Sequence, residues 1–305
     1  MKCRRCKAIA AVALPSHNTA FCPECFLGYF QGQIETAVRR HALLARDDRV
    51  LVAVSGGKDS LALTLELKRL GYDISALHVD LGIPDSSQPA RQTVEAFCER
   101  HGIPLRVVAL AEHGLAMPEV KRRVRRPICS VCGKVKRHWF NRAAREQGFT
   151  VLATGHNLDD EVARLFANTL RWDASYLSDQ GPLLPAEQGF ARKVKPLYRL
   201  SEFETACYCF LRGIEPHLAA CPFSTRASFT GHKRLWGELE HTSPGSKLSF
   251  YEGFLERGRP AFAAVEEKTG AALSPCPECG FPTSGEICGV CRLVRLMRGE
   301  PKGGR

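Results

Sequence analysis

The sequence lacks any long hydrophobic run, and this excludes the class of membrane-spanning proteins. Its longest apolar stretches, such as residues 9–14 and 49–54, are much shorter than the ~20 residues that cross a bilayer. The N-terminal stretch also has no apolar core followed by a cleavage site, because its short apolar run leads directly to His17 and Cys22. We therefore expect a cytoplasmic protein.

Compositional bias toward disorder is equally absent. Apolar residues make up 44% of the 305 residues and charged residues 25%, which is ordinary for a globular protein. The chain is long enough to bury a sizeable core. Its length suggests about two domains, or one large domain with appendages.

Negative charge is in deficit. Lys and Arg total 43 against 32 Asp and Glu, giving a net charge of +11, which favours a polyanionic partner. Part of the excess lies in residues 121–138, which contain no acid. Such a run can be a solvated helix face, but its position beside a cysteine pair favours RNA binding. The candidate RNA-binding residues are Arg122, Arg123, Arg125 and Arg126.

Fourteen cysteines in a chain without an export signal argue against a disulfide framework, because the cytosol keeps thiols reduced. Metal sites account for them better. Ten of the cysteines form five pairs with two residues between partners: Cys3/Cys6, Cys22/Cys25, Cys129/Cys132, Cys276/Cys279 and Cys288/Cys291.

The two terminal sets have the spacing of four-thiolate zinc sites, in which each pair forms a tight turn. Zinc binding would stabilise modules too small to fold on their own cores. Redox dithiols are the alternative, but two complete sets at opposite ends favour zinc. The first site comprises Cys3, Cys6, Cys22 and Cys25, and the second comprises Cys276, Cys279, Cys288 and Cys291.

Between these modules, apolar strands alternate with amphipathic helices, and this predicts an α/β fold with a doubly wound parallel sheet. Strands are predicted at residues 49–54, 73–79, 105–110 and 150–153, and helices at 61–70, 92–101, 134–147 and 159–170. Ser201 and Glu204 form a capping box that predicts a further helix. Ligands of such sheets bind beyond the carboxyl ends of the strands.

The first strand is followed by Ser55-Gly-Gly-Lys-Asp-Ser60, which leads directly into a helix. Its spacing matches neither a Walker A loop nor Gly-x-Gly-x-x-Gly. The glycines Gly56 and Gly57 permit close approach of the backbone to a phosphate, and Lys58 and the helix N-terminus add positive charge. The string resembles the PP-loop of ATP pyrophosphatases, which adenylate a substrate oxygen and release pyrophosphate.

Other strand ends agree with this resemblance. In PP-loop proteins the main chain near Ala53 and Val79 would hold the adenine. Residues 154–161 resemble the Gly-His-x-x-Asp-Asp signature of PP-loop enzymes that modify tRNA, with Gly155 and Asp160 at matching positions. Acids at a helix start are also stabilised by the helix dipole alone. We favour a functional Asp160, because carboxylates there could bind the magnesium that accompanies ATP.

Cys129 and Cys132 precede a basic helix, and Cys221 follows much later. A PP-loop, a central cysteine pair and one distant cysteine together resemble the PP-loop tRNA thiolases of the TtcA/TtuA superfamily. The terminal zinc modules and Gly155-His-Asn-Leu-Asp-Asp160 are most similar to the TtuA-type tRNA 2-thiouridine synthetases, which modify the T-loop uridine at position 54. Wobble-uridine thiolases are the nearest alternative, and cytidine tRNA thiolases are a further one.

This resemblance implies that Cys129, Cys132 and Cys221 hold a [4Fe-4S] cluster. It also implies ATP, Mg²⁺ and two Zn²⁺ as cofactors, with tRNA and a ubiquitin-like thiocarboxylated sulfur-carrier protein as partners. A homodimer is also expected. Lys136 lies one helical turn after Cys132, and we predict that it contacts the α-phosphate. The candidate catalytic residues are Asp59, Lys136 and Asp160, and the candidate ATP-binding residues are Ala53, Ser55, Gly56, Gly57, Lys58, Ser60, Val79 and Gly155.

Two other functions stay open at this point. A PP-loop ligase of lysidine-synthetase type, or an amide-forming synthetase, would not need the three central cysteines. A zinc-ribbon RNA-binding module with an inactive nucleotide fold would form no AMP. The predicted domains are an N-terminal zinc finger (1–30), a PP-loop catalytic domain (31–200), a helical extension with RNA-binding residues and the third cluster ligand (201–272), and a C-terminal zinc finger with a basic tail (273–305).

Overall fold

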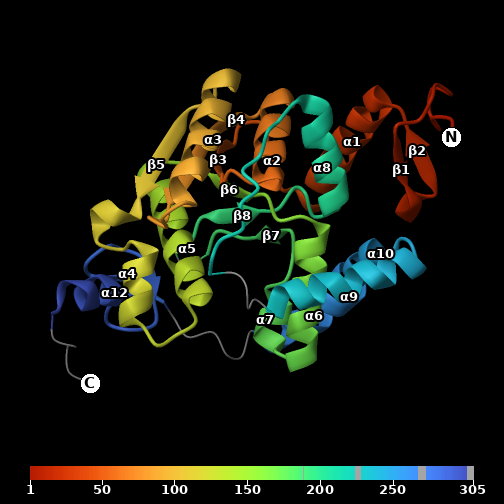
Figure 1. Ribbon diagram of the computed structural model, residues 1–305. Coiled ribbons are helices and arrows are strands. Elements are labelled where there is room, and N and C mark those ends of the chain that lie inside the picture. The colour runs from red at the N-terminus through yellow and green to blue at the C-terminus, as the bar shows by residue number, and fades with distance from the viewer. Residues whose placement is uncertain (188, 224–227, 267–272, 301–305) are drawn as a thin grey trace.

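The computed structural model describes residues 1–187, 189–223, 228–266 and 273–300. A six-stranded sheet with the order β5-β4-β3-β6-β8-β7 forms its centre (Figure 1). All neighbouring strands are parallel except β7, which pairs antiparallel with β8 at the edge. The prediction of a doubly wound sheet is thus confirmed, with one antiparallel edge strand added. The strands are β3 (Arg49–Ala53), β4 (Asp73–Asp80), β5 (Leu105–Ala109), β6 (Val151–Thr154), β7 (Leu183–Leu184) and β8 (Arg192–Val194).

Helices cover both faces of this sheet. Successive side chains of a strand point to opposite faces of the sheet, so they contribute to two separate cores. Val50 and Val52 belong to one core and Leu51 to the other. The helices of the chain are α1 (Pro23–His41), α2 (Lys58–Arg69), α3 (Ser87–His101), α4 (Met117–Arg123), α5 (Ile128–Glu146), α6 (Leu158–Arg171), α7 (Ala174–Ser178), α8 (Glu202–Arg212), α9 (Ser228–Thr242), α10 (Ser246–Gly253), α11 (Arg259–Glu266) and α12 (Gly289–Arg298).

Two predicted helices begin earlier than the periodicity indicated. The helix predicted from residue 92 starts at Ser87, because Pro89 is tolerated in the first turn, where amides lack intrahelical partners. The helix predicted from residue 134 starts at Ile128, just after Pro127. Cys129 and Cys132 therefore lie in the first turns of α5 rather than before it.

The chain ends carry small hairpin modules. In the first module β1 (Val12–Leu14) pairs with β2 (Thr19–Phe21), and α1 then runs without interruption across residue 30. In the second module β9 (Ser274–Pro275) pairs with β10 (Pro282–Thr283), and α12 follows. Within the described residues, no helix is both long and apolar enough to cross a membrane.

Candidate active site and zinc centres

A cavity of about 450 Å³ opens at the carboxyl ends of the strands, where a parallel sheet of this kind binds ligands. Loop residues that follow β3, β4 and β6 line it, together with side chains from α5 and from the segment after α8. The predicted residues in this lining are Ala53, Ser55, Gly57, Asp59, Ser60, Val79, Lys136, Gly155, Asp160 and Cys221.

The loop from Ser55 to Ser60 is held by its own hydroxyls. The Ser55 amide donates to Ser60 Oγ at 3.2 Å, and Ser60 Oγ donates to the Gly57 carbonyl at 2.9 Å. Gly56 has a φ of +87°, and a Cβ there would lie 3.0 Å from the Ala90 carbonyl oxygen. The loop therefore needs glycine at this position for conformation and for space.

Gly155 is required for a different reason. A Cβ on this residue would lie only 2.8 Å from the Ser60 amide nitrogen. The loop after β6 can thus pack directly on the first turn of α2 only when residue 155 has no side chain. This close approach brings the start of α6, which carries Asp160, beside the loop at Ser55–Ser60.

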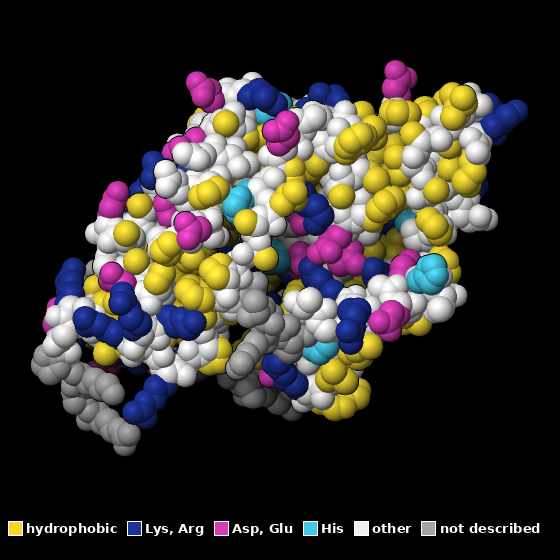
Figure 2. Space-filling view, in the orientation of Figure 1, with side chains coloured by type: hydrophobic (Ala, Val, Ile, Leu, Met, Phe, Trp, Pro, Cys, Tyr) yellow, Lys and Arg dark blue, Asp and Glu magenta, His cyan; other side chains and the backbone are white. Residues whose placement is uncertain are grey.

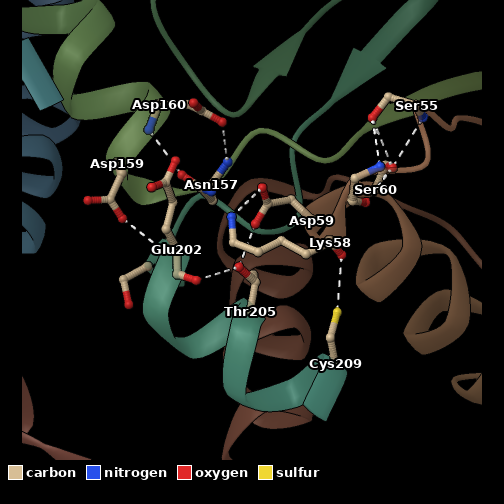
Figure 3. Close-up of polar contacts among 12 residues, drawn as sticks. Ser55, Lys58, Asp59, Ser60, Asn157, Asp159, Asp160, Glu202, Thr205 and Cys209 are labelled. Atoms are coloured by element: carbon tan, nitrogen blue, oxygen red, sulfur yellow. Dashed lines mark hydrogen bonds and ion pairs between the residues drawn. The ribbon is translucent and has the colours of Figure 1, made fainter. Parts of the chain in front are cut away.

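Lys58 and Asp59 open α2 and interact with each other at 3.0 Å (Figure 3). Thr205 Oγ1, on α8, donates to Asp59 Oδ1, and the Cys209 thiol donates to the Lys58 carbonyl at 3.4 Å. Helix α8 therefore orients the start of α2 from below the loop. Burial raises the pKa of the Cys209 thiol to about 12, so this cysteine is an unreactive thiol that packs in place.

Asp160 occupies two roles in the structure. Its carboxylate accepts the Asn157 amide at 3.2 Å while Asn157 Oδ1 accepts the Asp160 amide at 3.0 Å, a reciprocal capping box at the start of α6. The same carboxylate also lines the cavity and pairs with Lys233. Desolvation raises the pKa of Asp160, although the positive charge of Lys233 opposes this.

The two acids beside Asp160 are neutralised by lysines that do not line the cavity. Asp159 pairs with Lys247, and Glu161 pairs with Lys195 at 2.7 Å in the core. Both carboxylates are buried, whereas that of Asp160 faces the cavity. Only one of the three acids in this helix start is therefore placed to meet a ligand in the cavity.

The three central cysteines lie near one another, and one of them, Cys221, lines the cavity. The Cys129 thiol donates to the Phe223 carbonyl at 3.4 Å, which ties the start of α5 to the segment that carries Cys221. Desolvation raises the pKa of Cys132, and the nearby Lys136 opposes this, as expected for a thiol one turn from an ammonium group. Cys221 and Lys136 both line the cavity.

The donor set distinguishes these cysteines from a zinc site. Four sulfur atoms on one zinc ion, each bound at ~2.3 Å, lie within about 4.6 Å of one another. Among the described residues, only the two terminal sets gather three or more ligand atoms within 4.8 Å. The three central cysteines do not form such a set and so differ from the two terminal ones.

Both terminal sets have the geometry predicted for zinc. The set near the N-terminus is Cys3, Cys6, Cys22 and Cys25, and the set near the C-terminus is Cys276, Cys279, Cys288 and Cys291. Although desolvation acts in the opposite direction, neighbouring backbone amides lower the pKa of Cys3 to about 6 and that of Cys276 to about 7. In the same sets the pKa values of Cys6, Cys25, Cys279 and Cys291 are raised, so each set holds one thiol that deprotonates readily beside others that do not.

Of the four arginines predicted to bind RNA, one packs against another helix and three lie on the surface. Arg123 donates to the carbonyls of Leu296 and Met297 at 3.3 and 2.8 Å, and it thereby attaches the end of α12 to α4. Arg122, Arg125 and Arg126 are exposed. Figure 2 shows Lys and Arg side chains gathered over α4 and α12. The packing role of Arg123 was not foreseen in the sequence.

Sequence reasoning also missed Thr205, Lys233 and Glu202. Lys233 bridges Asp160 and Glu202 at 2.5 Å to each. None of these residues lies in a recognisable phosphate or metal motif. The capping box at Ser201 located the start of α8 and so gave the only signal, since it places Glu202 and Thr205 in the first turn.

Comparison with known proteins gives two family matches. Residues 29–214 match the PP-loop domain, and residues 2–27 match the N-terminal LIM domain of the 2-thiouridine synthetase TtuA. The first match covers more than half of the chain and contains the loop at Ser55–Ser60 and the cavity residues named above except Cys221.

Relatives span nearly the full chain. The tRNA-5-methyluridine(54) 2-sulfurtransferase of Thermus thermophilus is 45% identical over 96% of this chain and 91% of its own length. The protein of the same name from Pyrococcus horikoshii is 39% identical over 98% and 95%. Among solved structures, the U34-tRNA thiolase NcsA from Methanococcus maripaludis with its [4Fe-4S] cluster has a TM-score of 0.80 and 26% identity, covering 97% of this chain and 96% of its own.

Proposed function

The chain belongs to the PP-loop family and, within it, to the tRNA-5-methyluridine(54) 2-sulfurtransferases, and from this we propose that it replaces the C2 oxygen of 5-methyluridine 54 in tRNA with sulfur. It is an ATP-dependent tRNA sulfurtransferase. Position 54 is favoured over the wobble position because relatives named for position 54 are 39–45% identical, whereas the U34 thiolase is 26% identical.

One observation carries this proposal. The same cavity is lined by the PP-loop residues Ser55 and Ser60 and by Lys136 and Cys221 from the cysteine side. An adenylation site and a sulfur-bearing group would therefore act on one substrate atom without its release. A ligase of lysidine-synthetase type would have no use for the cysteine side of this cavity.

The C2 carbonyl of uridine is a weak electrophile, so its oxygen must first be converted into a leaving group. The uridine O2 attacks the α-phosphorus of ATP, the bond to the β-phosphate oxygen breaks, and pyrophosphate leaves into the loop formed by residues 55–60. A sulfur nucleophile then adds to C2, and AMP leaves with the former O2. Lys58 and the amides of the loop would neutralise charge on the departing pyrophosphate, and Lys136 would contact the α-phosphate.

Asp59 and Asp160 are the carboxylates placed to hold a magnesium ion with ATP, because both line the cavity. Each is paired with a lysine in the structure, so the metal would displace Lys58 or Lys233. Cys129, Cys132 and Cys221 would hold the cluster. With three protein ligands, a [4Fe-4S] cluster would leave one iron free to present sulfide.

The partners and remaining cofactors belong to the same proposal. Each terminal set of four thiolates would bind one structural zinc ion and leave it no open position for chemistry. The sulfur would come from a thiocarboxylated ubiquitin-like carrier protein. The enzyme would act as a homodimer in the cytoplasm, where tRNA resides.

Formation of AMP tests the proposal directly. We expect the purified, cluster-loaded protein to convert ATP to AMP and pyrophosphate when tRNA containing 5-methyluridine 54 is present. A tRNA with adenosine at position 54 should give no AMP, because adenine carries no C2 oxygen that could be adenylated. Equal AMP formation with both tRNAs would refute the assignment to position 54.

A further inference from the structure

Basic side chains gather near the ends of β6 and β8, around His156, a residue that lines the cavity. Lys136 and His156 line the cavity itself. Lys193 on β8 lies beside Leu152 of β6 in the parallel register, and His156 follows the end of β6. We call Arg137, Arg164 and Lys193 the basic rim.

Arg164 is placed by helix geometry. It follows Asp160 by four residues on α6, so the two side chains lie one turn apart on the same face. The Phe229 ring contacts both the Arg164 guanidinium, at 5.4 Å, and the Lys233 ammonium, at 5.5 Å. Arg164 therefore lies one helical turn from Asp160, which lines the cavity and pairs with Lys233.

No acid neutralises the basic rim in the part of the chain that the structure describes: Arg137, Arg164 and Lys193 have no ion pair there. The nearby acid Glu161 is already bound by Lys195, Gln180 and Tyr251. By contrast, Lys195, Lys233 and Lys247 on the neighbouring surfaces each pair with a carboxylate.

The clustered positive charges lower the pKa values of residues within the basic rim. Desolvation, followed by the charge of Lys195, lowers the pKa of Lys193 to about 8, although this side chain is only partly buried. Desolvation and then Arg164 lower the pKa of Arg137. Arg137 and Arg164 are exposed, so an anion from solvent can reach them. A bound anion would relieve this repulsion.

We propose that the basic rim binds the backbone phosphates that flank the target nucleotide of tRNA. The inference rests on the proposed function. Chemistry on a base requires that the nucleotide leave its stack and enter the active site, so its flanking phosphates are held at the mouth of the cavity. The ATP phosphates have their own cradle at residues 55–60, in the loop that follows β3.

Salt dependence of tRNA binding tests the proposal. Arg164→Gln and Lys193→Gln should each reduce the slope of log K against log salt by roughly 0.7 to 0.9, and the double variant by about twice that. Arg100→Gln removes the same charge from an exposed site at the end of α3, at the opposite edge of the sheet, and should leave the slope unchanged. Arg164→Lys and Lys193→Arg should retain the wild-type slope.

The affinity for a non-hydrolysable ATP analogue separates the two sources of phosphate. It should be unchanged in both Gln variants, and its loss would mean that the rim serves ATP instead. If the salt slope is unchanged in both variants while the wild-type protein thiolates tRNA, the proposed phosphate-binding role of the basic rim is wrong and the proposed function stands. Wild-type protein that binds no tRNA would overturn the proposed function together with the rim.

Discussion

Lys233 Nζ lies 2.5 Å from Asp160 Oδ1 and connects helix α9 to the wall of the active-site cavity. The same ammonium group binds Glu202 at the start of α8. Figure 2 shows the acidic side chains of this region in a hollow with basic side chains around them. One lysine thus neutralises two carboxylates from two helices and couples the helical region to the PP-loop site.

Replacing Lys233 with Met should destabilise the protein by about 1 to 3 kcal/mol, because it leaves Asp160 and Glu202 without their cation. Urea unfolding at neutral pH measures this change. Arg234→Met is the matched control, since Arg234 forms an exposed pair with Glu238 at 3.8 Å and should cost less than about 1 kcal/mol. Adding Asp160→Asn to Lys233→Met should restore part of the loss. Equal losses in the two single variants would contradict the bridging role.

Lys58→Ala should abolish AMP formation, because the loop then lacks the cation nearest the departing pyrophosphate. Thr205→Val should lower the rate less, since it removes only the hydroxyl that orients Asp59. Binding of tRNA should stay close to wild type in both, because one loop contributes little to a large RNA interface. Arg69→Ala, at the far end of α2, serves as the control. Normal AMP release from Lys58→Ala would refute the PP-loop assignment.

Substitutions of the central cysteines and of the terminal cysteines should have different effects on metal content and stability. Cys221→Ser should yield a folded protein with full zinc content and no iron, which binds ATP and transfers no sulfur. Cys276→Ser should lose one zinc ion and destabilise the C-terminal module, because zinc binding and folding are coupled there. Metal analysis of anaerobically purified variants checks both. Full thiolation by the iron-free Cys221→Ser variant would show that sulfur transfer does not need the cluster.

Lys193 should make stability depend on pH between about 8 and 10. Its folded pKa is about 8, below the ordinary value of about 10.4, so over this range the unfolded chain holds the extra proton. Stability from this site therefore rises as pH increases. Lys193→Met should stabilise the free protein at pH 7, and the gain should shrink toward pH 10. A gain that is constant with pH would mean that Lys193 has an ordinary pKa.

The sheet and the phosphate loop were predictable because their signals are local. A buried strand, two glycines and a helix start lie within a dozen residues, and β3, the loop at Ser55–Ser60 and α2 follow as expected. The four-cysteine sets are equally local, since each pair needs only one tight turn. The capping box at Ser201 was confirmed in the same way.

Contacts between distant segments were not predictable. Lys233 approaches Asp160 only because α9 packs on α6, and Thr205 reaches Asp59 only because α8 packs on α2. The start of α5 was missed because the cysteines and glycine at residues 129–133 weaken its helical pattern, whereas Pro127 and the packing of α5 set its true beginning. The basic rim combines three elements and has no sequence motif.

Mass spectrometry of tRNA nucleosides, with fragment mapping, tests the central claim most directly. Cells that lack this protein should contain 5-methyluridine at position 54 where cells that carry it contain the 2-thio form, and re-expression of the intact chain should restore the sulfur. The Cys221→Ser chain should not restore it. Unchanged thiolation at position 54 in the deletion strain, or a loss confined to position 34, would contradict the account.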